Sequence, residues 1–268
     1  MLKISYQLLN NKFKKQKMKH ILIISILSII MFSCNDDMED NVMQEDVTFN
    51  FHFHPTVDGE EFSTNHTYNI DNQEIVFSNV SFYMSNLILK HNDGQELKFD
   101  KETNEKEDDL FLLVSADKMI YEGVTVPGGE YTDLSFQIGV DTVVNSTIEP
   151  SAWPSDHPLS EDYPGFAYWS WNSGYKFIVA EGTINGEEFR YHIGTNNLIR
   201  TINLSADFML MEDGNEIMIS YDIAEFFSGI DLSNPDNFVN MTFTDPVQAG
   251  KIADNVVGAL QLMSGHQM

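Results

Sequence analysis

The sequence predicts a mainly β protein: one antiparallel β-sandwich or barrel-like domain with a short helix and a C-terminal helix. From Val47 the residues alternate between apolar and polar over several positions, as in a strand with one buried face. Short apolar segments follow along the chain, separated by turn sequences such as Asn185-Gly186. The chain is 42 % hydrophobic and 12 % aromatic, which is enough for a packed core. Short strands between such turns are typical of a sandwich or barrel.

The strand predictions rest on runs of β-branched and aromatic residues between turn residues. In the first strand, Phe49, Phe51 and Phe53 lie on one face, and His52 and His54 lie on the other. The further predicted strands are 80–90, 110–114, 130–140, 175–181, 187–193, 199–204, 208–211 and 216–220. Asn185-Gly186 is the strongest hairpin signal, because both residues tolerate the positive φ angles of a two-residue turn.

Two helices complete the predicted fold. The first, 222–228, is short and ends at Gly229. The second, 245–264, has Asp245 to cap its first turn, Pro246 at a position that needs no backbone donor, and Gly265 beyond its end. Its apolar residues form one stripe, so we expect it to pack against a sheet.

The amino terminus is typical of a secreted lipoprotein. Residues 1–33 form a predicted signal peptide, with a basic region and an apolar run, 21–32, that is too short to span a bilayer. Met18 is an alternative start to Met1. Cys34, the only cysteine, follows the apolar run and resembles the lipidated residue of a lipobox. We therefore expect a lipid anchor in the outer membrane, facing the periplasm or the cell surface.

After Cys34, residues 34–46 are expected to form a lipidated acidic tether, and residues 47–268 the β domain. The acidic run after the cysteine resembles the export tag of Bacteroidetes surface lipoproteins; a plain solvated tether explains it equally well. The formal net charge of the chain is -26. So acidic a surface repels phosphate backbones, which argues against nucleic-acid binding. We expect no enzyme, because the sequence holds no nucleophile elbow, phosphate-binding loop or metalloprotease motif.

Three histidines are the candidate metal ligands. His52 and His54 are two residues apart on a strand, so their Cα atoms lie roughly 6–7 Å apart on one face, and two imidazoles can converge on one ion. His192 is the third candidate, on the polar face of its own strand. Imidazole sets suit copper and zinc. The alternative is that all three are ordinary surface or packed histidines without a metal.

A second candidate feature is the aromatic segment around Trp169 and Trp171. A proline-rich stretch, 145–165, leads into it, and a stretch of that length inside a domain is usually a lid or a binding loop. Trp153 and Tyr168 add to the aromatic group. This group supports the alternative function: a surface module that binds a glycan or a protein partner without metal.

Several segments together resemble the MbnP-like family of methanobactin-associated copper-binding proteins. The most specific is Trp169-x-Trp171 with the following Gly-Tyr-Lys-Phe (174–177) and the later His192-Ile-Gly. Further matching segments are 47–59, 82–87, 126–131, 136–141 and 252–255.

The resemblance implies a secreted β-rich domain that binds copper for acquisition or storage, through His52, His54 and His192. It places the aromatic residues Trp169, Trp171 and Tyr175 near the metal. Some relatives have a tryptophan oxidised to kynurenine by a dihaem peroxidase partner, and Trp169 or Trp171 would be that residue here. The chain lacks the cysteines of the methanotroph members, so a lipoprotein branch of the family is expected.

Overall fold

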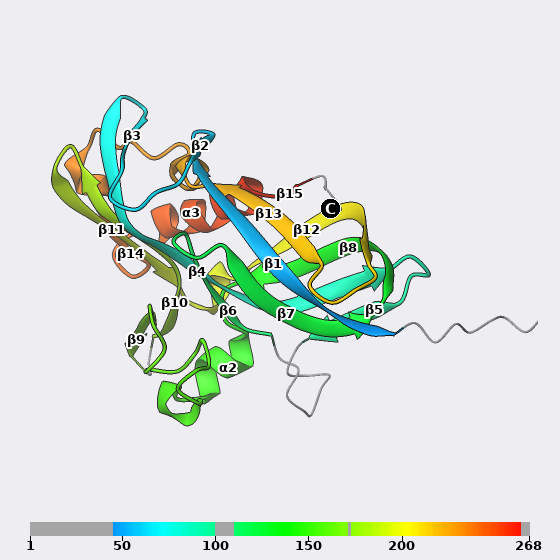
Figure 1. Cartoon of the computed structure of the whole chain (residues 1–268). Helices are drawn as coiled ribbons and strands as arrows, with labels where there is room; N and C mark the ends of the chain where they lie inside the picture. The colour runs from blue at the N-terminus through cyan, green and yellow to red at the C-terminus, as the bar shows by residue number, and fades with distance from the viewer. Residues whose placement is uncertain (1–44, 100–109, 171–172, 264–268) are drawn as a thin grey trace, which may run out of the picture. The chain divides into compact units, whose positions relative to one another are not determined.

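The alternating first strand forms as predicted and belongs to the smaller of two sheets. The computed structural model describes residues 45–99, 110–170 and 173–263 (Figure 1). Residues from Glu45 onward form a compact unit. The signal peptide, Cys34 and Trp171 lie outside the described residues. No helix within the described ranges is long and apolar enough to cross a membrane.

In the described part of the chain, the strands form two sheets. The five-stranded sheet has the order β15-β13-β1-β2, and β7 also pairs with β1. The ten-stranded sheet has the order β12-β8-β4-β10-β11-β14, and four shorter strands attach to β4 and β10. The bounds in the first sheet are β1 Asp46–Val57, β2 Glu60–Glu61, β7 Ile120–Pro127, β13 Glu216–Asp222 and β15 Leu260–Leu262.

In the second sheet the longest strand is β4, which pairs with five others. The bounds are β3 Thr67–Ile70, β4 Gln73–His91, β5 Glu96–Phe99, β6 Leu112–Ser115, β8 Gly129–Ile138, β9 Tyr168–Ser170, β10 Gly174–Ile184, β11 Glu187–Gly194, β12 Arg200–Leu210 and β14 Val239–Met241. Asn185 and Gly186 join β10 to β11 with φ angles of 52° and 85°, which confirms the predicted hairpin turn.

The core lies between the sheets and is built from aromatic rings. Phe49, Phe51 and Phe53 of β1 are fully buried. Phe53 meets Phe82 of β4 edge to face, with ring centroids 6.1 Å apart, and thereby joins the two sheets. His52 and His54, which alternate with the buried residues, therefore project from the outer face of β1, as the sequence predicted.

The fold departs from the prediction in its strand pairing. β1 pairs with β13 in parallel, and so does β11 with β14, whereas we expected antiparallel pairs throughout. Alternation reveals which face of a strand is buried but not the direction of its neighbour. The predicted strands 199–204 and 208–211 are one strand, β12, with an irregular register between Ser205 and Phe208.

The helices also differ from the prediction in extent. α3, Pro246–Ala259, begins as expected, because the Asp245 carboxylate accepts hydrogen bonds from the amides of Val247 and Gln248. It ends earlier than residue 264, since Leu260 to Leu262 continue as β15 and pair with β13. The predicted helix 222–228 is a shorter 3-10 helix, η4 Ala224–Phe227.

The remaining helical elements are short. A six-residue helix, α2 Thr142–Thr147, was not predicted; Asp141 caps it. The 3-10 helices are η2 Pro150–Ala152, η3 Asn196–Leu198 and η5 Pro235–Asn237. α2 and η2 lie in the proline-rich stretch, which therefore has structure of its own.

Candidate functional site

His52 and His54 form a stacked pair in the middle of β1. Their ring centroids are 4.1 Å apart and the ring planes are inclined by 30°. The outer face of β1 presents both rings, because the residues on either side of them point into the core. This confirms the predicted shared face and shows that the two side chains are in direct contact.

The ring nitrogens of the two histidines differ in their hydrogen bonds. Nδ1 of His52 lies 2.9 Å from Oε2 of Glu216, and this carboxylate occupies that nitrogen. Nε2 of His54 is buried and has no hydrogen-bond partner. Burial lowers the pKa of His54, and the neighbouring His52 lowers it further, while Glu216 and Glu61 oppose the shift. A neutral imidazole with an open nitrogen is the form that binds a metal ion.

The neighbouring strand β13 adds side chains to the same face. Met218 is directly opposite His52 in the parallel register, and Ser220 is opposite His54. Side chains at paired positions share a face, so the Met218 side chain is on the same outer face of the sheet as the imidazole pair. Sequence reasoning missed Glu216 and Met218. Their alternation with Ile217 and Ile219 marked a strand face, but nothing in the sequence indicated that this face adjoins His52.

His192 lies in the other sheet, on β11. Its Nε2 is 2.7 Å from Oε1 of Glu181 on the adjacent strand β10, and its Nδ1 is buried without a hydrogen-bond partner. Burial lowers the pKa of His192, while the hydrogen bond with Glu181 opposes the shift. The arrangement is a second carboxylate–histidine pair, attached through the opposite ring nitrogen.

Trp169 lies next to this second pair. Gly194 follows His192 by two residues and so shares its face of β11. A Cβ atom at Gly194 would lie 2.7 Å from Cζ3 of Trp169, so the absent side chain is what lets the indole approach β11. Nε1 of Trp169 is buried without a partner, and the ring centroid is 5.2 Å from that of Phe243.

Tyr175 serves to hold the proline-rich stretch in place. It is fully buried, and its hydroxyl donates a hydrogen bond to the Leu159 carbonyl, with an O···O distance of 2.7 Å. Burial raises its pKa well above the ordinary value. Its ring packs edge to face on Tyr83 and Tyr168. The residue therefore belongs to a packed aromatic cluster under the stretch.

The predicted site residues that the structure describes thus form two separate groups instead of one. The structure brings His52 to His54, and His192 to Trp169, but the pair is on the five-stranded sheet and His192 on the ten-stranded one. Within residues 45–99, 110–170 and 173–263, no group of three or more His, Cys, Asp or Glu residues is arranged to hold a metal ion. Among the predicted residues, Trp171 and Cys34 are not described.

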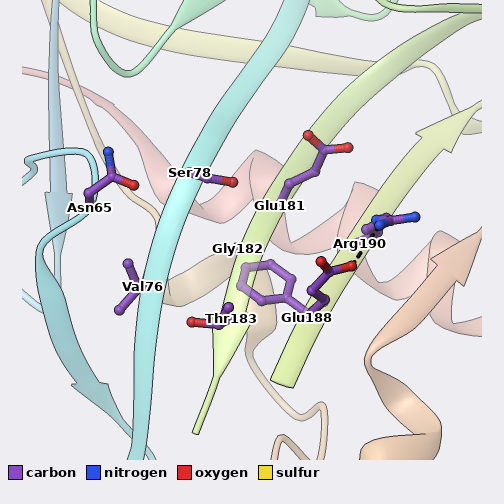
Figure 2. A pocket seen from close by; sticks show the side chains of 9 residues that line it. Asn65, Val76, Ser78, Glu181, Gly182, Thr183, Glu188 and Arg190 are labelled. Carbon is purple, nitrogen blue, oxygen red and sulfur yellow. Dashed lines mark hydrogen bonds and ion pairs between the residues drawn. The ribbon is translucent and has the colours of Figure 1, made fainter. Parts of the chain in front are cut away.

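A groove opens on the outer face of the ten-stranded sheet beside the second pair. It has a volume of about 470 Å³ and runs over β4, β10 and β11. Glu181 lines it together with Arg190 and Glu188, which form an ion pair of 2.7 Å (Figure 2). The carboxylate that binds His192 is therefore reached from this groove.

Comparison with known proteins places the chain in a family. A family model described as MbnP matches residues 46–242, which include all three candidate histidines and Trp169. No curated protein matches the chain. A solved structure, MbnP from Methylosinus trichosporium, is 17 % identical, with a TM-score of 0.48 over 73 % of this chain and 81 % of that chain. Because the family model covers more than half of the sequence, the chain belongs to the MbnP family.

Proposed function

We propose that this protein is a secreted lipoprotein that binds a copper ion through His52 and His54, for copper acquisition or storage. The observation that carries the proposal is the stacked pair itself: two adjacent imidazoles on an outer strand face, with Nε2 of His54 lacking any hydrogen bond. A buried imidazole nitrogen without a partner costs free energy, and a metal ion would remove that cost.

The donor atoms around the pair favour copper over zinc. Imidazole binds both metals, but thioether sulfur favours cuprous copper, and Met218 lies opposite His52. Membership of the MbnP family supports a copper-related role in general.

His192 and Trp169 are proposed to form a second site on the domain, where a tryptophan is oxidised. Here an imidazole with an open Nδ1 lies near an indole, which is the combination expected for a tryptophan oxidised beside a metal. A dihaem peroxidase partner would carry out that oxidation. Intact-mass spectrometry of the protein purified from its native host tests this, since conversion of tryptophan to kynurenine exchanges one carbon for one oxygen and so raises the mass by a fixed amount.

The membrane anchor is a separate proposal. It rests on Cys34 after the apolar run, and the protein would be held in the outer membrane, facing the periplasm or the cell surface. Labelling of cells with a radioactive fatty acid tests it. Label should appear in the wild-type protein and be absent from the Cys34→Ala variant; label retained by that variant would contradict the anchor.

Copper titration tests the central proposal. We expect the chain with Cys34→Ser to bind one equivalent of copper(I) in competition with a chromophoric chelator. The double variant His52→Ala/His54→Ala should lose this equivalent, and His192→Ala, which changes a histidine of the other sheet, should keep it. Stoichiometric binding by the double variant would overturn the proposed site.

The second candidate function is a binding module for a glycan or a protein partner. Phe243, next to Trp169, is 59 % exposed, which favours a contact surface at this point. Other aromatic rings of the group are used internally, since Trp153 stacks on His157 and Tyr168 on Phe166. Quenching of tryptophan fluorescence by oligosaccharides, with no response to copper, would favour this function over copper binding.

A further inference from the structure

Glu216 has a defined contact that only the parallel pairing of β1 with β13 creates. In the register it lies opposite Asn50, two residues before His52, and therefore on the same outer face. From there its carboxylate reaches diagonally to Nδ1 of His52, at 2.9 Å. The Glu216 side chain is 38 % exposed, so the contact lies at the surface of the sheet.

The contact determines which nitrogen of His52 is open. A carboxylate only accepts hydrogen bonds, and a neutral imidazole carries one N–H. The hydrogen must therefore be on Nδ1 when that nitrogen faces Glu216, and the lone pair is on Nε2. His54 has its unpartnered nitrogen at the same ring position, Nε2.

We propose that Glu216 is a positioning residue that fixes His52 in the Nδ1–H form, so that a metal ion bound at the pair is held by Nε2 of both histidines. The inference rests on the proposed copper function and deepens it, by assigning the ligand atoms and the residue that orients one of them. A metal-bound histidine commonly donates its other N–H to a carboxylate, which holds the ring and raises its basicity.

A second carboxylate near the pair provides a matched control. Glu61, opposite Thr56 across the β1–β2 pairing, raises the pKa of His54 through its charge, as Glu216 does. In contrast to Glu216, it makes no side-chain hydrogen bond to either histidine among the described residues. Removing Glu61 therefore lowers the local negative charge and leaves the orienting contact in place.

The first measurement is the tautomer of His52 in the metal-free chain with Cys34→Ser. Nitrogen-15 NMR of the imidazoles distinguishes Nδ1–H from Nε2–H directly, at about pH 8, where an ordinary imidazole is neutral. We expect His52 to be in the Nδ1–H form. Glu216→Ala should shift it toward Nε2–H, whereas Glu216→Gln, whose amide oxygen still accepts, and Glu61→Gln should leave it unchanged.

The second measurement is copper(I) affinity of the same four proteins. We expect Glu216→Ala to weaken binding by roughly 10- to 100-fold, with a smaller loss in Glu216→Gln and in Glu61→Gln. An Nε2–H tautomer in the unsubstituted chain would overturn the role of Glu216, as would a Glu216→Ala variant with unchanged tautomer and affinity. If the unsubstituted chain binds no copper, the proposed function fails, while the tautomer still reports the positioning contact.

Discussion

The two carboxylate–histidine pairs of this protein are alike in chemistry and opposite in setting. Glu216 bonds Nδ1 of His52 at 2.9 Å on the five-stranded sheet, and Glu181 bonds Nε2 of His192 at 2.7 Å on the ten-stranded sheet. The His52 side chain is 18 % exposed and stacks on a second histidine; the His192 side chain is 8 % exposed and lies near an indole.

The difference suggests a division between metal binding and structure. The first pair presents two imidazoles on the outer face of β1, with the His52 side chain partly exposed to solvent. In the second pair the His192 imidazole is buried near Trp169, so it contributes to packing as well as to any chemistry, while Glu181 lines the groove. Four predictions test this division, in order of decreasing expected effect.

Copper should stabilise the protein through the first pair. At a free copper(I) concentration of about 100 times Kd, the free energy of unfolding should rise by about 2.7 kcal/mol. The gain should persist in His192→Ala and vanish in His52→Ala/His54→Ala, as measured by chemical unfolding under anaerobic conditions. If His192→Ala abolished it instead, the roles of the two places would be reversed.

Gly194→Ala should disturb the second place alone. The new Cβ would lie 2.5 Å from the Tyr175 carbonyl oxygen and 2.7 Å from the Trp169 ring. We expect a loss of roughly 1–3 kcal/mol in unfolding free energy and altered tryptophan fluorescence, with copper affinity unchanged. Gly250→Ala, in α3 with nothing within 4 Å of its Cβ, is the control and should be neutral or stabilising. Equal effects of the two substitutions would argue against the close approach of Trp169.

Loss of His192 should lower the free energy of unfolding more than loss of His52. His192→Ala removes a buried ring and leaves Glu181 without its partner, which should cost roughly 1–3 kcal/mol. His52→Ala removes a ring whose carboxylate partner is solvent-exposed, and should cost about 1 kcal/mol or less. Urea unfolding of the two metal-free variants checks this. A larger loss in His52→Ala would indicate that the outer pair is structural.

One buried tyrosine from each of the two sheets should ionise only at high pH. Burial raises the pKa of Tyr121, on β7, and of Tyr131, on β8, each to about 12. Their contribution to stability is therefore fully present below about pH 10, the ordinary phenol pKa, and is lost as the pH rises through about 12. Absorbance titration of Tyr121→Phe and Tyr131→Phe should each show one late-ionising tyrosine fewer. Ionisation of either residue near pH 10 would show that its side of the core is open to water.

Much of the local structure could be predicted from the sequence. The alternation from Val47 identified a strand with its histidines outward, Asn185-Gly186 identified a hairpin, and Asp245 with Pro246 identified a helix start. Each of these signals acts over a few residues, through side-chain direction, turn conformation or capping. The end of α3 was not predictable in the same way, because the pairing of Leu260 to Leu262 with β13 competes with helix continuation.

The sequence by itself determined that this is a β-rich domain with an imidazole pair on one strand face and a resemblance to the MbnP-like family. Only the tertiary structure decided what lies next to each histidine. His52 and Glu216 are 164 positions apart, and their contact depends on a parallel pairing that leaves no mark on either strand. His192 is separated from the pair for the same reason: alternation fixes the face of a strand, whereas the assignment of strands to sheets depends on how the whole core packs.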